Sequence, residues 1–145
     1  MTNVKNRCVL IKLILAAGIA VLLLMAINYI RISRINTDFA TKAYLKFHYI
    51  DKTIDTEIRD NDLKTLKDIL QGFSYKDTAT PGCGFDPNIS ITLTDGHKSI
   101  TFCPACDMCE GFRIGNTNRY LDVSKEKRKL FEKIVKKHGM TFPCN

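Results

Sequence analysis

Apolar side chains change their spacing along this chain, and each change predicts a different element. Residues 8–30 are apolar except for Lys12 and Asn28. At about 1.5 Å per residue, a helix of this length spans the roughly 30 Å hydrocarbon layer of a bilayer. The pattern therefore predicts a transmembrane helix inside an N-terminal anchor, residues 1–30, that holds a small domain, residues 31–145.

After this run the apolar residues keep a helical spacing. They are separated by 3, 4, 4, 4, 3, 4 and 4 positions, without an intervening Pro or Gly. A spacing near 3.5 is typical of one stripe on a helix, so we expect a stalk helix over residues 31–60. The stripe can pack on the domain's own sheet or pair two copies of the chain in a coiled coil. Its members are Ile32, Ile35, Phe39, Ala43, Phe47, Ile50, Ile54 and Ile58.

A short second helix, capped by Asp62 and ended by Gly72, is expected next. Beyond it the spacing changes to two, which predicts strands that bury one face. The first hairpin turns at Asp95-Gly96, and a second turns near Thr117. The predicted strands cover 89–94, 98–102, 111–115 and 119–123.

The last predicted element is an amphipathic helix from the cap Ser124 through Lys137. Leu130, Phe131, Ile134, Val135 and His138 are expected on its inner face. The predicted class is thus α+β: a transmembrane helix continuing into a long stalk helix, a short second helix, a four-stranded antiparallel sheet and a C-terminal amphipathic helix.

Charge is distributed unevenly along the chain. The net charge of +7 divides into +5 for residues 1–37, −3 for 38–122 and +5 for 123–145. A nucleic-acid interface needs a continuous basic face with stacking aromatics, and the chain has no Trp, so no nucleic-acid partner is expected. No nucleophile elbow or phosphate loop occurs, so we expect no enzyme activity. His48 is expected at the flank of the stalk, and Asp55 on its solvated face.

The N-terminal pattern also predicts a location. A basic start before an apolar run resembles an export signal, and cysteines downstream suit an oxidising compartment. No small-x-small cleavage site follows, because Leu24-Met25-Ala26 has a bulky residue where a small one is needed. We therefore expect an uncleaved, single-pass signal anchor with a cytosolic N-terminus and an extracytoplasmic C-terminal domain, and the lipid bilayer as partner of residues 8–30.

The most unusual stretch is Cys103-Pro-Ala-Cys106-Asp-Met-Cys109. Outside the cytosol, disulfides would stabilise a small domain by about 2–4 kcal/mol each. The number of cysteines beyond the N-terminal segment is odd, so connectivity stays open and one thiol is left over. The disulfide candidates are Cys83, Cys103, Cys106, Cys109 and Cys144.

Two alternatives use the same loop. Thiolates from Cys83, Cys103, Cys106 and Cys109 form a candidate set of ligands for zinc or an iron–sulfur cluster, with Cys144 or His97 as other fourth ligands. The second alternative is thiol–disulfide exchange, since Cys103-Pro-Ala-Cys106 resembles the active-site motif of thioredoxin-like proteins. Gly111 and a strand pattern follow too soon for the helix that this family places after its motif.

An N-terminal membrane helix, a long stalk and a cysteine-closed antiparallel sheet resemble type IV pilins in outline. The pilin processing site, a Gly before Phe with a Glu five residues into the mature chain, does not occur, so filament assembly is not expected. The function expected is that of a membrane-anchored, non-enzymatic binding or envelope-complex module. It would bind a protein partner or self-associate through the stalk helix. The alternative is a metal-binding or redox protein that uses the cysteine loop.

Overall fold

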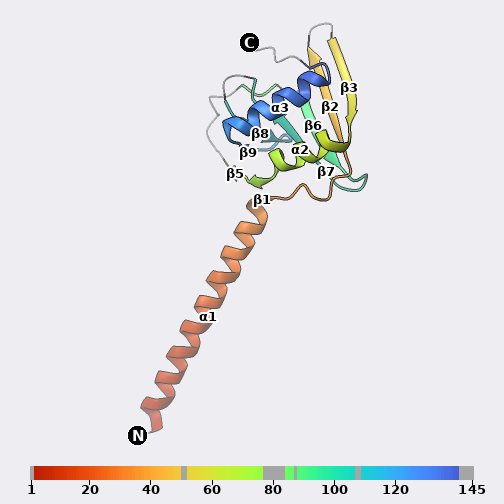
Figure 1. The fold of residues 1–145 in the computed structure, drawn as a ribbon. Helices are drawn as coiled ribbons and strands as arrows, with labels where there is room; N and C mark the ends of the chain where they lie inside the picture. Colours follow the sequence, from red (N-terminus) through yellow and green to blue (C-terminus); the bar gives the residue numbers. More distant parts are fainter. Residues whose placement is uncertain (1, 50–51, 77–83, 87, 107–108, 141–145) are drawn as a thin grey trace. The chain divides into compact units, whose positions relative to one another are not determined.

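A computed structural model describes residues 2–49, 52–76, 84–86, 88–106 and 109–140. The chain divides into two compact units, Met1–Arg34 and Ile35–Asn145. The first unit contains one helix, α1 (Thr2–Ser33). The second contains the sheet and the two remaining helices of the described chain (Figure 1).

Helix α1 occupies the segment that was predicted to cross a membrane. Its side chains are described over residues 11–27, and all of them are exposed. Among the described residues no helix is long and apolar enough to cross a membrane. This finding contradicts the predicted transmembrane helix over residues 8–30, together with the signal anchor and the single-pass membrane localisation that were inferred from it. The lipid bilayer as partner of residues 8–30 stays a prediction.

The second unit is built on a seven-stranded antiparallel sheet, so the prediction of four strands is wrong. The strand order is β3-β2-β6-β7-β8-β9-β5. A separate two-stranded sheet joins β1 (Arg34–Ile35) to β4 (Gly72–Phe73). The strands of the large sheet are β2 (Lys42–Tyr49), β3 (Lys52–Ile58), β5 (Tyr75–Lys76), β6 (Ile89–Thr94), β7 (Ser99–Pro104), β8 (Gly111–Ile114) and β9 (Arg119–Asp122).

The predicted stalk helix over residues 31–60 is also wrong, because most of this segment forms the hairpin of β2 and β3. The two strands pair antiparallel, from Ala43 opposite Ile58 to Tyr49 opposite Lys52. Residues four apart lie on one face of a strand as well as on one stripe of a helix, since four is twice the strand period. The side chains of Ala43 and Phe47 are both buried for this reason. Self-association through a stalk helix therefore has no helix to act through.

Other predicted elements occur where the sequence placed them. Helix α2 (Asp60–Leu70) is the short second helix, although it begins before Asp62 and its N-cap, Arg59, provides no side-chain cap. Strands β6 and β7 form the hairpin around Asp95-Gly96. Helix α3 (Lys125–Lys137) begins at Ser124, whose Oγ accepts a hydrogen bond from the Lys127 amide at 3.4 Å.

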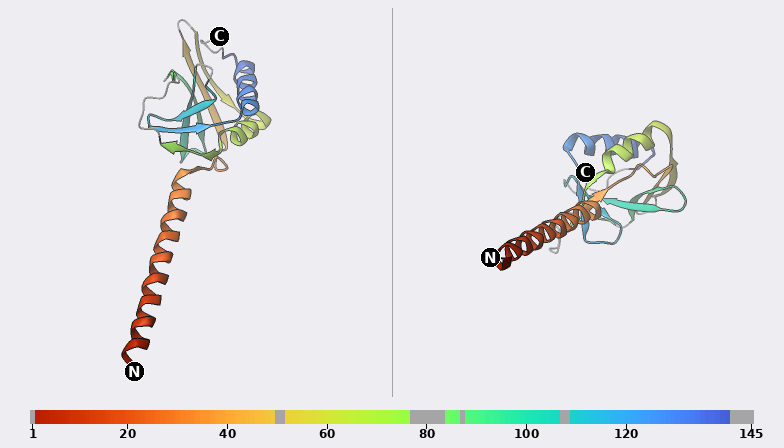
Figure 2. Two further views of the ribbon diagram at one scale, coloured as in Figure 1. Left: turned by 90° about the vertical axis from the view of Figure 1, so that its left-hand side faces the viewer. Right: turned by 90° about the horizontal axis from the view of Figure 1, so that it is seen from below.

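Both α2 and α3 lie on the same face of the sheet, which we call the inner face (Figures 1 and 2). Alternate residues of the strands point to this face and are buried there. Phe112 of β8 meets Phe131 of α3 edge-to-face, with 4.9 Å between ring centroids. The fully buried side chains of this core include Leu45, Phe47, Ile58, Leu66, Ile69, Ile89, Ile91, Leu93 and Phe102.

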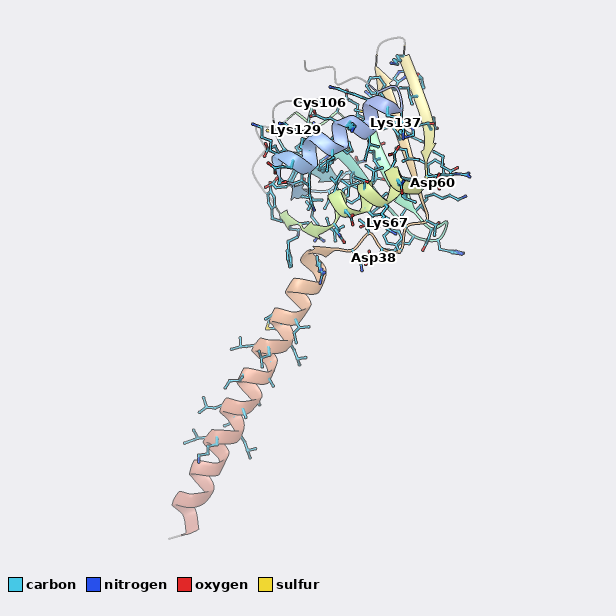
Figure 3. All side chains as sticks on the ribbon, in the orientation of Figure 1. Asp38, Asp60, Lys67, Cys106, Lys129 and Lys137 are labelled. Carbon is cyan, nitrogen blue, oxygen red and sulfur yellow. The ribbon has the colours of Figure 1, made fainter. Side chains whose placement is uncertain are left out.

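Polar contacts hold the helices to each other and to the segment before β2. The Lys67 ammonium donates to the carbonyls of Asp38 and Ala40 at 2.9 and 3.0 Å; Figure 3 labels Lys67 and Asp38. Asp62 Oδ2 of α2 accepts a hydrogen bond from Lys137 Nζ of α3 at 2.7 Å, and His138 Nε2 lies 3.1 Å from the same oxygen. These contacts fix α2 and α3 at the same end of the inner face.

Two helical leucines test which side of each helix is buried. Leu66 of α2 is fully buried, whereas Leu130 of α3 is 47% exposed although the sequence predicted it to face inward. Leu66→Ala should lower the free energy of unfolding by about 2–5 kcal/mol, because it removes buried methyl groups and leaves a cavity. Leu130→Ala, the matched control, should change it by less than about 1 kcal/mol. Urea unfolding measures both, and equal losses would contradict the packing.

Asp62 should make stability depend on pH. The hydrogen bond from Lys137 and the nearby His138 hold the pKa of Asp62 below its ordinary value of 3.8. A carboxyl with a lowered pKa in the folded state stabilises the fold above its unfolded pKa, and this contribution is lost as pH falls through the folded pKa. Asp62→Asn should therefore reduce stability by up to about 1 kcal/mol at pH 7 and little at pH 2. A loss that is unchanged between the two pH values would contradict this account.

Candidate functional site

The cysteine loop is held between strand β7 and helix α3. Cys103 belongs to β7 and is 4% exposed. Cys106 is also buried, and its amide donates to the Gly84 carbonyl at 2.7 Å. These contacts hold the beginning of the predicted cysteine loop against the sheet.

No disulfide joins any two of the cysteines whose side chains are described, namely Cys103, Cys106 and Cys109. Cys103 is a free, buried thiol, which corrects the prediction for this residue. Cys109 is disulfide-bonded, and neither Cys103 nor Cys106 is its partner. The other candidates, Cys83 and Cys144, lie outside the described residues.

The described residues contain no group of three or more His, Cys, Asp or Glu side chains that could hold a metal ion. The structure thus does not bring Cys103, Cys106 and Cys109 together as three ligands. His97 lies in the β6–β7 turn, where its amide donates to Asp95 at 2.8 Å. Since Cys83 is not described, the zinc, iron–sulfur and redox alternatives stay predictions.

Sequence reasoning missed a buried arginine that fixes this loop to α3. Arg128 is 6% exposed, and its Nη2 donates to the Ala105 carbonyl at 2.7 Å. Its Nε lies 3.1 Å from Glu132, and its guanidinium lies 5.7 Å from the rings of Phe112 and Phe131. Its position three residues before Phe131 placed it on the inward stripe of α3, which was the available signal.

The outer face of the sheet, opposite the helices, carries a row of polar and aromatic side chains. The register pairs Lys46 with Asp55 on one side and with Ser90 on the other. Because Ile91 pairs with Phe102, the next outward neighbours are Ser90 and Cys103. Pairing then continues through β8, β9 and β5. In order across the sheet the row is Asp55, Lys46, Ser90, Cys103, Arg113, Tyr120 and Tyr75.

One half of this outer face is covered by aromatic rings. Phe85 lies 5.5 Å from the ring of Tyr120, which lies 5.9 Å from Tyr75. The Arg113 guanidinium is 5.8 Å from the Phe85 ring. Its Nε is buried without a hydrogen-bond partner in the described part of the chain. Cys103, next to Arg113, is on the covered half, so its thiol is not accessible.

The other half of the outer face, over β2, β3 and β6, contains an open hollow of about 260 Å³. His48 Nδ1 lies 2.8 Å from the Thr53 hydroxyl, which fixes the imidazole across the hairpin. The lining combines hydroxyl, amide, imidazole, ammonium and carboxylate groups. The residues that line it are Lys46, Phe47, His48, Thr53, Ile54, Asp55, Asn88 and Ser90.

Charges around the hollow are of both signs. Lys46 and Asp55 are neighbours in the register, yet neither forms an ion pair or a hydrogen bond through its side chain with any described residue. Glu57, the next outward residue of β3, is bound by Arg59 at 2.8 and 3.0 Å. These bonds lower the pKa of Glu57. Asp55 is thus the carboxylate left available to a partner.

Comparison with known proteins identified no relative. No protein-family model, curated protein or solved structure matches this chain. The hollow is therefore interpreted through its own residues and geometry.

Burial of Cys103 gives a direct check of the outer face. In the native full-length chain, iodoacetamide should alkylate Cys103 slowly, because only 4% of the residue is exposed. Unfolding in urea should make the reaction at least about tenfold faster, since the thiol then reaches solvent. Peptide mass spectrometry quantifies the modified fraction. Equal rates in native and unfolded protein would contradict the covered position.

Proposed function

We propose that this chain is a non-enzymatic binding module that holds a polar peptide segment of a partner protein in the outer-face hollow. The observation that carries the proposal is the pair Lys46 and Asp55, whose charges point into solvent at the hollow without partners among the described residues. Helices α2 and α3 cover the inner face (Figure 2), so the open half of the outer face is the part of the sheet that a partner can reach.

The chemistry of the lining favours a peptide. A peptide segment offers both donors and acceptors, and the hollow offers acceptors at Asp55 and Asn88 and donors at Lys46, Asn88 and Ser90. Nε2 of His48 can act as a donor or as an acceptor, because Nδ1 already forms a hydrogen bond with the Thr53 hydroxyl. The mixed lining therefore matches a segment that carries both kinds of group.

The size of the hollow supports the same choice. Sites that enclose a small molecule measure about 300–1,000 Å³ and are mostly apolar. This hollow has a volume of about 260 Å³ and is open, and six of its eight lining residues are polar or charged. It can take a few side chains of a segment that lies across the strands.

Selection from a displayed library of random peptides tests this function with the full-length chain. Peptides enriched on the wild-type chain should change their affinity by about tenfold or more for Lys46→Glu, with the direction set by the charge of the peptide, since this change reverses the charge inside the hollow. Lys133→Glu makes the same charge change on the exposed side of α3 and serves as the matched control. Fluorescence anisotropy with labelled peptides measures the affinities.

Recovery of no binding peptide from the library would contradict the proposed function. So would peptides whose affinity changes equally for Lys46→Glu and Lys133→Glu, because binding would then depend on net charge rather than on the hollow.

A further inference from the structure

Strand β3 is an open edge of the sheet (Figure 1), and three of its residues line the hollow. It has seven residues, and its pairing with β2 runs without a bulge from Ile58 to Lys52. No described segment forms a backbone hydrogen bond with β3 on its other side. Alternate residues of an edge strand direct their N–H and C=O groups outward, so β3 presents a row of backbone donors and acceptors.

Protection of this edge is limited. Proteins usually block such edges with charged side chains, Pro, bulges or a covering segment, and as far as the structure describes the chain, β3 has only the first of these. In the described residues β3 has no Pro or bulge, and its charged residues are Lys52, Asp55 and Glu57. The opposite edge of the sheet is β5, which has two residues within the described part of the chain.

The two faces of β3 differ in character. Thr53, Asp55 and Glu57 point to the outer face, where Glu57 is already bound by Arg59. Ile54 and Thr56 point inward and are half-buried. The side chain of Ile54 is packed against the core of the domain. A strand added here would place outward side chains beside Asp55 and inward side chains beside Ile54.

Two copies of the chain are poor partners for each other at this edge. Antiparallel pairing about the middle of β3 would set the two Asp55 carboxylates directly opposite one another. Like charges at opposed positions are destabilising, whereas opposite charges are favourable. The charge at this edge therefore favours a different chain that brings a cation.

We infer that the peptide partner of the hollow binds by adding a strand to the β3 edge, with a Lys or Arg beside Asp55 and an apolar residue beside Ile54. The inference rests on the proposed function and specifies its partner: an extended segment with alternating basic and apolar residues. Backbone bonds to β3 would provide affinity, and the Asp55 and Ile54 positions would provide selectivity.

Synthetic peptides as long as β3 test this directly with the full-length chain. A peptide of alternating Lys and Val should bind, and one of alternating Glu and Val should bind at least about tenfold more weakly. The chain itself carries +7, so general attraction does not favour the basic peptide. N-methylation of alternate amides should also weaken the Lys-Val peptide about tenfold or more, because it removes the donors that face β3. Two N-methylated peptides are needed, one methylated at the odd-numbered amides and one at the even-numbered amides, since only one of these two sets of N–H groups faces β3.

A charge reversal supplies the matched variants. Asp55→Lys should invert the preference, so that the Glu-Val peptide binds more tightly than the Lys-Val peptide. Asp68→Lys, the same change at an exposed position of α2, should leave the preference unchanged. Circular dichroism and thermal unfolding confirm that both variants fold, and Asp55→Asn provides a milder variant if Asp55→Lys does not.

The outcomes separate this inference from the proposed function. If library peptides bind through Lys46 but neither Asp55 variants nor N-methylation affect them, strand addition is wrong and the hollow remains the site. If neither library peptides nor the Lys-Val peptide bind, both proposals are wrong. Binding of the Lys-Val peptide that tolerates N-methylation in both registers also overturns the inference.

Discussion

Burial of one face of an antiparallel sheet is the constraint on which the second unit depends. Leu45 and Phe47 of β2, together with the inward residues of β6 and Phe102 of β7, are fully buried on this face. Leu66 of α2 and Phe131 of α3 close the core from the other side. Because side chains alternate along a strand, a shift of pairing by one residue would move these groups to the outer face, so the core fixes the register.

That register determines what the outer face carries. Once the inner positions are assigned, Lys46, His48, Thr53, Asp55 and Ser90 must point the other way, and neighbouring strands bring them together. Aromatic rings around Tyr120 cover the far half of the face, whereas the half over β2, β3 and β6 stays open. The proposed binding function follows from this division into a covered and an open half.

The sequence predicted those elements whose signals are local. The cap Ser124, the Asp95-Gly96 turn and the alternation of Ile89, Ile91 and Leu93 each identify an element from a few neighbouring residues. The β2–β3 hairpin was mistaken for a helix because its buried residues also fit a spacing of four. The Thr, Ile and Tyr content of this segment was a signal for strands that the spacing argument outweighed.

The candidate site could be predicted only in part, because it depends on pairing between segments that are distant in the sequence. The cysteine loop stood out by its spacing, but the position of Cys103 beside Arg113 depends on pairing between distant segments. His48 and Asp55 were assigned to the surface of a helix, where no hollow could form. Arg128 was counted among the solvated lysines of α3, because its charge outweighed its position on the inward stripe.

Cross-strand nuclear Overhauser effects in the full-length chain test the central claim most directly. The account predicts contacts between backbone protons of Leu45 and Thr56 and between those of Lys46 and Ser90, which the register pairs. It also predicts that residues 42–49 and residues 52–58 each lack the internal contacts between residues three apart that a helix produces. A continuous series of such helical contacts through this segment, without the cross-strand contacts, would contradict the sheet and the site built on it.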